Sequence, residues 1–165
     1  MRYASTTIEE VAKTGMTNRL DFSIADIPAG MAVATSLVLN LPPLPAFKAS
    51  DIVMGVALHV TTPFANTADA AFNSVTVSLG DAGLATRFLS AIQVNANGTP
   101  VIDTYPGGAP NYIYTAAGQL TLTINSMAAK TLSALNVGKA FVLLGVLRLS
   151  GPITAVPPFG TGYTA

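Results

Sequence analysis

The stretch that decides the fold is residues 74–95, SVTVSLGDAGLATRFLSAIQVN. Its first six residues alternate valine or leucine with serine or threonine, and a period of two is typical of a half-buried β-strand. Gly80-Asp81-Ala82-Gly83 follows, and both glycine and aspartate favour tight turns. A second strand is expected over residues 86–95. The stretch therefore predicts a β-hairpin, and with it a fold built on antiparallel strands.

The same kind of pattern recurs along most of the chain, with proline- or glycine-containing turns between the segments. Further strands are predicted at residues 20–25, 31–41, 51–61, 101–105, 111–115, 119–125 and 141–149. Two of them, 51–61 and 141–149, are apolar on both faces and are expected to be covered on both sides. Residues 127–136 allow one or two helical turns.

Two details of this pattern predict pairing and orientation. Asn97-Gly98 tolerates positive φ at both positions, so it predicts a hairpin between the strand at 86–95 and the one at 101–105. In the strand at 119–125, leucine and isoleucine are expected to face inward, which leaves the threonines to solvent or a partner. About eight short strands with few helical segments predict an all-β protein, an antiparallel β-sandwich that is jelly-roll-like.

The length of 165 residues suits one domain with extended terminal arms. Residues 1–16 are expected to form an N-terminal arm or a short helix, because Thr6 and Glu9 have the spacing of a capping box. Residues 17–150 are the β-sandwich domain. Residues 151–165 carry Phe159 and Tyr163 without any period and predict a C-terminal extended arm. Both arms are expected to become ordered against neighbouring chains.

Charge is scarce: charged residues make up 10% of the chain, the net charge is zero, and half of the residues are hydrophobic. This argues against nucleic-acid binding and against intrinsic disorder. The apolar runs are too short to cross a membrane, and Glu9 with Glu10 does not support a signal peptide. So little charge favours a surface that meets protein, and with the two-sided apolar strands it predicts a homotrimer or a larger closed oligomer; the alternative is a low-charge monomer.

Residues able to carry out catalysis or bind a metal are few. The chain has no cysteine and one histidine, His59, which is expected to be an ordinary strand residue. Ala82 stands where a serine esterase would need its nucleophile, and the sequence contains neither a Gly-x-Ser-x-Gly nor a Ser-x-x-Lys motif. No enzyme activity, catalytic residue or cofactor is therefore predicted. Asp69, Asp81 and Asp103 lie in predicted loops and could together bind Ca²⁺, but they lack the spacing of a calcium loop and are expected to be solvated turn caps.

Two short motifs have an ordinary explanation beside a functional one. Leu41-Pro42-Pro43-Leu44-Pro45 could form a polyproline II ligand for an SH3-like groove, or simply a rigid link between strands. Asn97-Gly98-Thr99 matches a glycosylation sequon, but turn formation explains it better in a chain without a secretory signal. The rigid link and the turn are the favoured interpretations.

The segments Val75-Thr76-Val77-Ser78-Leu79-Gly80-Asp81-Ala82-Gly83 and Thr86-Arg87-Phe88-Leu89-Ser90-Ala91 resemble a stretch common in small virion proteins of tailed bacteriophages. The chain is similar in particular to capsid decoration, or cement, proteins. That resemblance implies a trimeric β-sandwich without catalytic residues, made in the host cytoplasm. It also implies a partner, the major capsid protein, and a place on the capsid surface, where the protein would stabilise the shell by bridging capsomers.

Two alternatives remain open. A head-fibre or tail-associated structural module would be expected to show longer low-complexity or coiled-coil segments than this sequence contains. A carbohydrate-binding β-sandwich would usually display aromatic platforms, whereas this chain has no tryptophan and five tyrosines.

Overall fold

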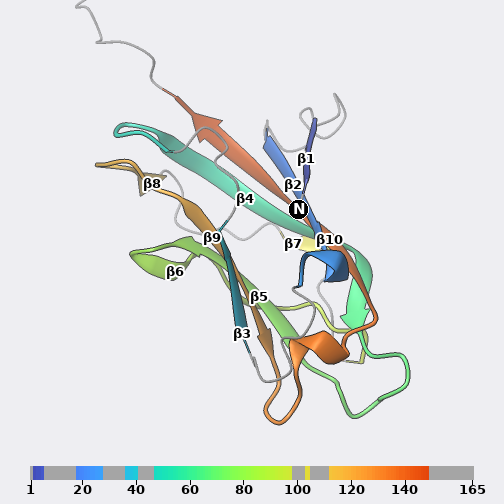
Figure 1. Ribbon diagram of the computed structural model, residues 1–165. Helices are drawn as coiled ribbons and strands as arrows, with labels where there is room; N and C mark the ends of the chain where they lie inside the picture. Colours follow the sequence, from blue (N-terminus) through green and yellow to red (C-terminus); the bar gives the residue numbers. More distant parts are fainter. Residues whose placement is uncertain are drawn as a thin grey trace, which may run out of the picture.

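The computed structural model describes residues 2–5, 18–27, 36–40, 47–97, 103–104 and 112–148. Two antiparallel sheets face each other in a β-sandwich (Figure 1). The strands are β1 (Arg2–Ser5), β2 (Asn18–Ser23), β3 (Ser36–Asn40), β4 (Ile52–Ala65), β5 (Val75–Asp81), β6 (Leu84–Gln93), β7 (Asp103–Thr104), β8 (Tyr112–Ile113), β9 (Leu120–Ser126) and β10 (Val137–Leu147). The all-β sandwich predicted from the sequence is confirmed.

The strand order is that of a jelly roll. One sheet runs β1-β2-β10-β4-β7, with β8 also paired to β4, and the other runs β3-β9-β5-β6. Four of the pairs are nested around the β5–β6 turn: β5 with β6, β4 with β7, β3 with β9, and β2 with β10. The chain is thus one long hairpin rolled into two sheets, as the jelly-roll-like prediction required.

The core lies between the sheets and follows from the alternation in the sequence. Leu20 and Phe22 of β2 are buried, and so are Leu122 and Ile124 of the facing strand β9. The rings of Phe22 and Phe64 stack with centroids 5.7 Å apart. Burying a side chain of this size stabilises the fold by about 1.5–3 kcal/mol, so the alternating positions determine which face of each strand turns inward.

The two strands expected to be covered on both sides lie side by side. β10 is paired with β2 on one side and β4 on the other, with Val142 opposite Leu58 and Phe141 opposite His59. Residues 137–147 alternate between the main core and the opposite face, where Phe141 and Leu143 are also buried. The prediction of a deeply placed last strand is therefore confirmed.

The hairpin expected within residues 74–95 and the short helical segment agree with the sequence-based predictions, whereas residues 2–5 differ from them. β5 and β6 form the expected hairpin, and residues 127–136 contain one 3₁₀ turn, η2 (Leu132–Ala134). Residues 2–5, expected to be part of an arm or short helix, instead form a strand that covers the free edge of β2. Thr6, Glu9 and residues 151–165 lie outside the described residues.

The hairpin predicted from Asn97-Gly98 is wrong. β6 and β7 lie in different sheets, since β6 pairs with β5 and β7 pairs with β4. After β6 the chain stops pairing with β5 and contacts β4 instead. The Phe64 N–H of β4 donates to the Val94 carbonyl at 2.8 Å, and Phe64 forms an isolated parallel β-bridge with Asn95. The segment leads from one sheet to the other, and Asn97 is the last of its residues that the structure describes before β7.

The outer face of the four-stranded sheet is less open than the threonine pattern predicted. Thr121 is buried, with 8% exposure, and it lies opposite Gly80, where the start of β6 closely approaches β5. A Cβ on Gly80 of β5 would lie 2.1 Å from the carbonyl oxygen of Leu84 in β6, so only glycine allows β5 and β6 to approach each other this closely. Val38 remains exposed on the same sheet.

Candidate interaction surfaces

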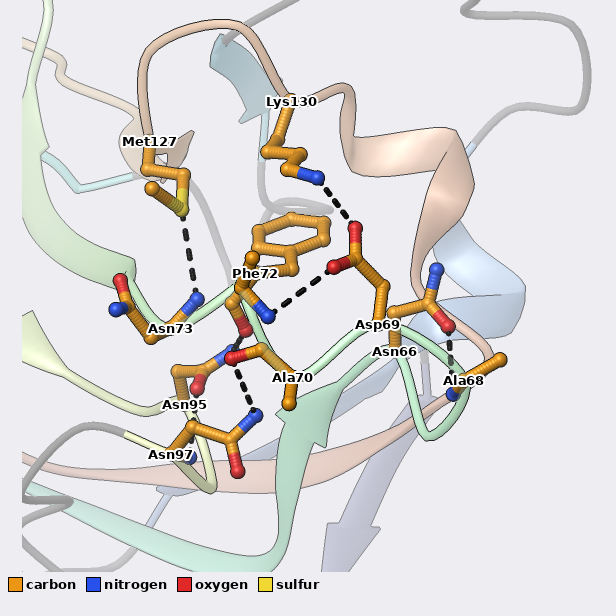
Figure 2. A network of polar contacts seen from close by, with 11 residues as sticks. Asn66, Ala68, Asp69, Ala70, Phe72, Asn73, Asn95, Asn97, Met127 and Lys130 are labelled. Atoms are coloured by element: carbon orange, nitrogen blue, oxygen red, sulfur yellow. Dashed lines mark hydrogen bonds and ion pairs between the residues drawn. The ribbon is translucent and has the colours of Figure 1, made fainter.

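Three connections meet at one end of the sandwich: residues 66–73, 94–97 and 127–136, called here the loop end (Figure 2). Asp69 stabilises the loop at residues 66–73 and connects it to another. Its carboxylate accepts the Ala71 N–H at 3.1 Å, and it also pairs with Lys130 of the loop at residues 127–136. Lys130 thereby lowers the pKa of Asp69. Both side chains are about one-third exposed, so solvent screens this ion pair, which cross-links the loops more than it stabilises the fold.

Asparagines connect the first loop with the crossover. The amide of Asn95, fully buried, donates to the Phe72 carbonyl at 3.2 Å, and Asn97 donates to the Ala70 carbonyl at 3.4 Å. The Asn73 N–H donates to the sulfur of Met127 at 3.4 Å (Figure 2). These bonds hold the loop end in one conformation, so a partner would pay little conformational entropy on binding it.

The Asp81 carboxylate lies at the opposite end of β5, where Arg87 and Tyr114 contact it. Arg87 donates to it at 2.6 Å and the Tyr114 hydroxyl at 3.1 Å, and the N–H groups of Gly83 and Leu84 bind it at 2.9 Å each. Burial alone would raise the pKa of Asp81, but these donors outweigh it and lower the pKa. Burial, with the neighbouring Asp81 charge, raises the pKa of Tyr114.

The predicted solvated turn caps are therefore corrected at two positions. Asp81 does cap the turn after β5, but it is buried, at 7% exposure. Asp103 lies in the short strand β7 and not in a loop. Asp69 is a turn cap, as expected. Among the residues that the structure describes, no three aspartate, glutamate or histidine side chains gather where they could bind a metal ion.

The outer face of the six-stranded sheet carries an aromatic and ionic cluster. The ring of His59 stacks on Phe141 with centroids 4.7 Å apart. The guanidinium of Arg19 lies 3.9 Å from the centre of the same ring and pairs with Asp21 at 3.0 Å. His59 is thus a half-buried strand residue in contact with an aromatic ring, and the cation–π contact explains how Phe141 is shielded on an outward face.

Farther along this face lies an apolar patch, defined as Ile52, Met54, Ile113 and Leu147. Ile52 is opposite both Leu147 and Ile113 in the sheet, so these three side chains share one face. Met54 has no opposite residue, because the register shifts there: Gly145 pairs with Gly55 and Val146 with Val53. Met54 and Ile113 are each 54% exposed and Leu147 43%. Clustered exposed apolar side chains of this size mark interaction surfaces.

Comparison of this chain with known proteins and solved structures gives information on its fold. No protein-family model and no curated protein matches the sequence. A chain of the solved structure titled "Cyanophage Pam1 capsid asymmetric unit" is similar to this chain with a TM-score of 0.52 and 19% identity, over 78% of this chain and 79% of that chain. The likeness extends over most of both chains, and at this identity it shows a shared fold.

Sequence reasoning missed the apolar patch. The two-sided apolar pattern at 51–61 and 141–149 was its only signal, since β8, which adds Ile113, has two residues.

Leu41-Pro42-Pro43-Leu44-Pro45 and Thr99 lie outside the described residues. The structure describes two helical turns of three residues each, η2 and η1 (Ile24–Asp26), the latter where the end of the strand predicted at residues 20–25 was expected. Neither is long or apolar enough to span a membrane.

Proposed function

We propose that this protein is a structural component of a phage virion that binds the outside of the capsid and stabilises the shell by bridging capsomers. The observation that carries the proposal is the likeness, over about four-fifths of both chains, to a chain of a phage capsid asymmetric unit. Jelly rolls are common in viral capsid proteins but also occur in lectins, so the fold by itself leaves the carbohydrate-binding alternative open to the test below.

The distribution of charge supports a protein-facing surface. Four basic side chains among the described residues are paired with carboxylates of the same chain: Arg19 with Asp21, Arg87 with Asp81, Lys130 with Asp69, and Arg148 with Asp51. Charges neutralised in this way neither attract nucleic acid nor repel a neutral protein surface. Contacts with the major capsid protein would then depend on shape and on small polar groups.

The loop end is the part of the described chain best suited to meet the shell. Its backbone is held by its own asparagines and by the Lys130–Asp69 pair, and Ala68, Ala70 and Asn73 are exposed on it. A rigid surface without net charge binds weakly at each site, but the free energy adds up over many copies and capsomers. Binding that favours the assembled shell stabilises it by mass action.

No catalytic activity is part of the proposal, and neither is a cofactor. The proposal also includes three further points: the protein forms a homotrimer, its partner is the major capsid protein, and it is located on the virion surface. The low charge of the sequence and the resemblance to cement proteins motivate all three.

The proposal is tested by challenging particles with heat or low osmotic strength, with and without the protein. Particles stripped of it should rupture at a lower temperature, and adding it back should restore the threshold. Ala70→Glu, at the loop end, should restore it poorly, because it places a charge in a neutral contact. The matched control Thr86→Glu, exposed on β6, should restore it fully.

Unchanged rupture in fully stripped particles would overturn the shell-stabilising function. If stripping changed attachment to the host and not rupture, a head-fibre or tail-associated module would replace it. Binding to a glycan array without binding to particles would favour the carbohydrate-binding alternative.

A further inference from the structure

We infer that Asn73, at the loop end, is a site of spontaneous deamidation, in which its neutral side-chain amide becomes a carboxylate. Asparagine is among the chemically labile residues of proteins, and the small residue Ser74 follows it here. This modification requires only the chain and water, so it goes beyond the proposed function and does not depend on a shell.

The reaction begins at the backbone nitrogen of Ser74. This nitrogen loses its proton and attacks the side-chain carbonyl carbon of Asn73. A C–N bond forms, ammonia leaves, and the product is a five-membered cyclic imide. Water then opens one of the two C–N bonds of the ring, which gives either aspartate or isoaspartate at position 73. No atom is oxidised or reduced.

The side-chain amide of Asn73 is available for this reaction. The residue is exposed, and its amide points away from the other residues drawn at the loop end (Figure 2). Among the described residues, its only hydrogen bond comes from its backbone, whose N–H donates to the Met127 sulfur at 3.4 Å. Four other asparagines of the loop end use their side chains in hydrogen bonds: Asn66, Asn95, Asn97 and Asn136. Turning the Asn73 amide toward Ser74 therefore breaks no hydrogen bond.

The attacking nitrogen is not held either. Ser74 lies one residue before β5, and its N–H donates no hydrogen bond within the part of the chain that the structure describes. The bonds of the sheet begin at the next residue, where the Val75 N–H donates to the side-chain oxygen of Gln93 at 3.0 Å. Ser74 itself is held through its hydroxyl, which accepts the Gln93 amide at 3.3 Å.

The chain contains the same dipeptide a second time, at Asn125-Ser126. Asn125 lies in β9, opposite Ser36 of β3 on one side and Thr76 of β5 on the other. A backbone that is held extended between two neighbouring strands cannot bring the nitrogen of residue 126 to the side chain of residue 125 unless the sheet opens locally. The two sites therefore share their local chemistry and differ in structure.

The two products change the loop end in different ways. Aspartate at position 73 adds a negative charge to a surface where the carboxylate of Asp69 is already paired with Lys130. Isoaspartate lengthens the main chain by one carbon directly before β5, whose first residue, Val75, is fully buried. Aged copies therefore carry an additional charge, and some of them a longer main chain, on the surface proposed to meet the shell.

The experiment ages the wild-type full chain at neutral pH, folded in buffer and unfolded in urea, and locates deamidation by peptide mapping with mass spectrometry. In the folded chain, Asn73 should deamidate about tenfold faster than Asn125 or more, because only Asn125 has to wait for a sheet to open. In urea the two sites should react at the same rate, since the dipeptide is the same. Gly98 lies outside the described residues, so Asn97 is mapped separately.

The control variant is Asn73→Gln, which keeps a neutral amide but is too long to form the five-membered ring. It should gain no carboxylate at position 73 over the same period, and a gain at the wild-type rate would overturn the mechanism. Equal rates at Asn73 and Asn125 in the folded chain would overturn the inference. So would a reaction of Asn73 in urea without any in the folded chain, or no reaction at either site in urea.

Discussion

Removing the Asp81 carboxylate should destabilise the fold strongly, because several donors bind it at once. Asp81→Ala removes five hydrogen bonds at once: two from Arg87, one from Tyr114 and two from the turn N–H groups of Gly83 and Leu84. Breaking a buried pair by deleting one partner costs about 3–5 kcal/mol. Arg87 keeps 19% exposure and can partly rehydrate, so about 3 kcal/mol is expected.

The assay is equilibrium unfolding in urea followed by circular dichroism. With a slope of about 2 kcal/mol per molar, a loss of about 3 kcal/mol moves the midpoint down by about 1.5 M. Asp81→Asn keeps an oxygen acceptor for the turn and should lose about half as much. The control is Asp69→Asn, which breaks the more exposed pair with Lys130 and should barely move the midpoint. A midpoint for Asp81→Ala equal to that of the control would refute the reasoning.

The pH dependence follows from the direction of the shift. The pKa of Asp81 is lower in the folded state than in the unfolded chain. The ionised carboxylate therefore contributes fully to the stability of the fold when the pH is above its pKa in the unfolded chain, about 3.9, and the contribution is lost as the pH falls through its pKa in the folded state. The difference between wild type and Asp81→Asn should therefore be constant near pH 7 and shrink only below about pH 4. A difference that already disappeared between pH 7 and pH 5 would contradict this assignment.

Three further predictions concern the core, the histidine and the C-terminal segment. Gly138→Ala should destabilise the fold by about 1–3 kcal/mol in urea unfolding, because Gly138 has φ +156° and a Cβ there would lie 2.3 Å from the ring of Phe64; a wild-type midpoint would contradict the packing. His59→Ala should change stability at most, and any hydrolase or transferase turnover lost by that variant with its fold intact would contradict the prediction that the chain is not an enzyme. Deleting residues 151–165 should leave the circular dichroism spectrum unchanged while weakening attachment to particles, and attachment at full strength would argue against a role for this segment.

The strands were predictable where alternation was strong. Val75, Val77 and Leu79 gave the β5 strand, and Leu120, Leu122 and Ile124 gave β9, because each apolar side chain must be buried on one face of a sheet. The nested order of the jelly roll was predictable only as a class, since which distant strands pair depends on contacts that no local period records.

Two local signals failed because longer-range bonds outweighed them. Asn97-Gly98 favours a tight hairpin, but bonds from Asn95 to Phe72 and from Phe64 to Val94 draw the chain across to the other sheet. Asp81 looked like a solvated turn residue because its partners, Arg87 and Tyr114, are 6 and 33 positions away. The apolar patch was hidden for a related reason: its four members come from three strands, and one of those strands has two residues.

The central claim is that this protein lies on the outside of a phage capsid, and locating it in purified virions tests the claim most directly. Cryo-electron microscopy of the particles, with mass spectrometry to identify the chain, gives the position of its density. We expect density for a jelly-roll sandwich on the outer surface that spans neighbouring capsomers, with the loop end toward the shell. Density confined to a fibre or the tail, or no copy of the chain in particles that contain every other structural protein, would contradict it.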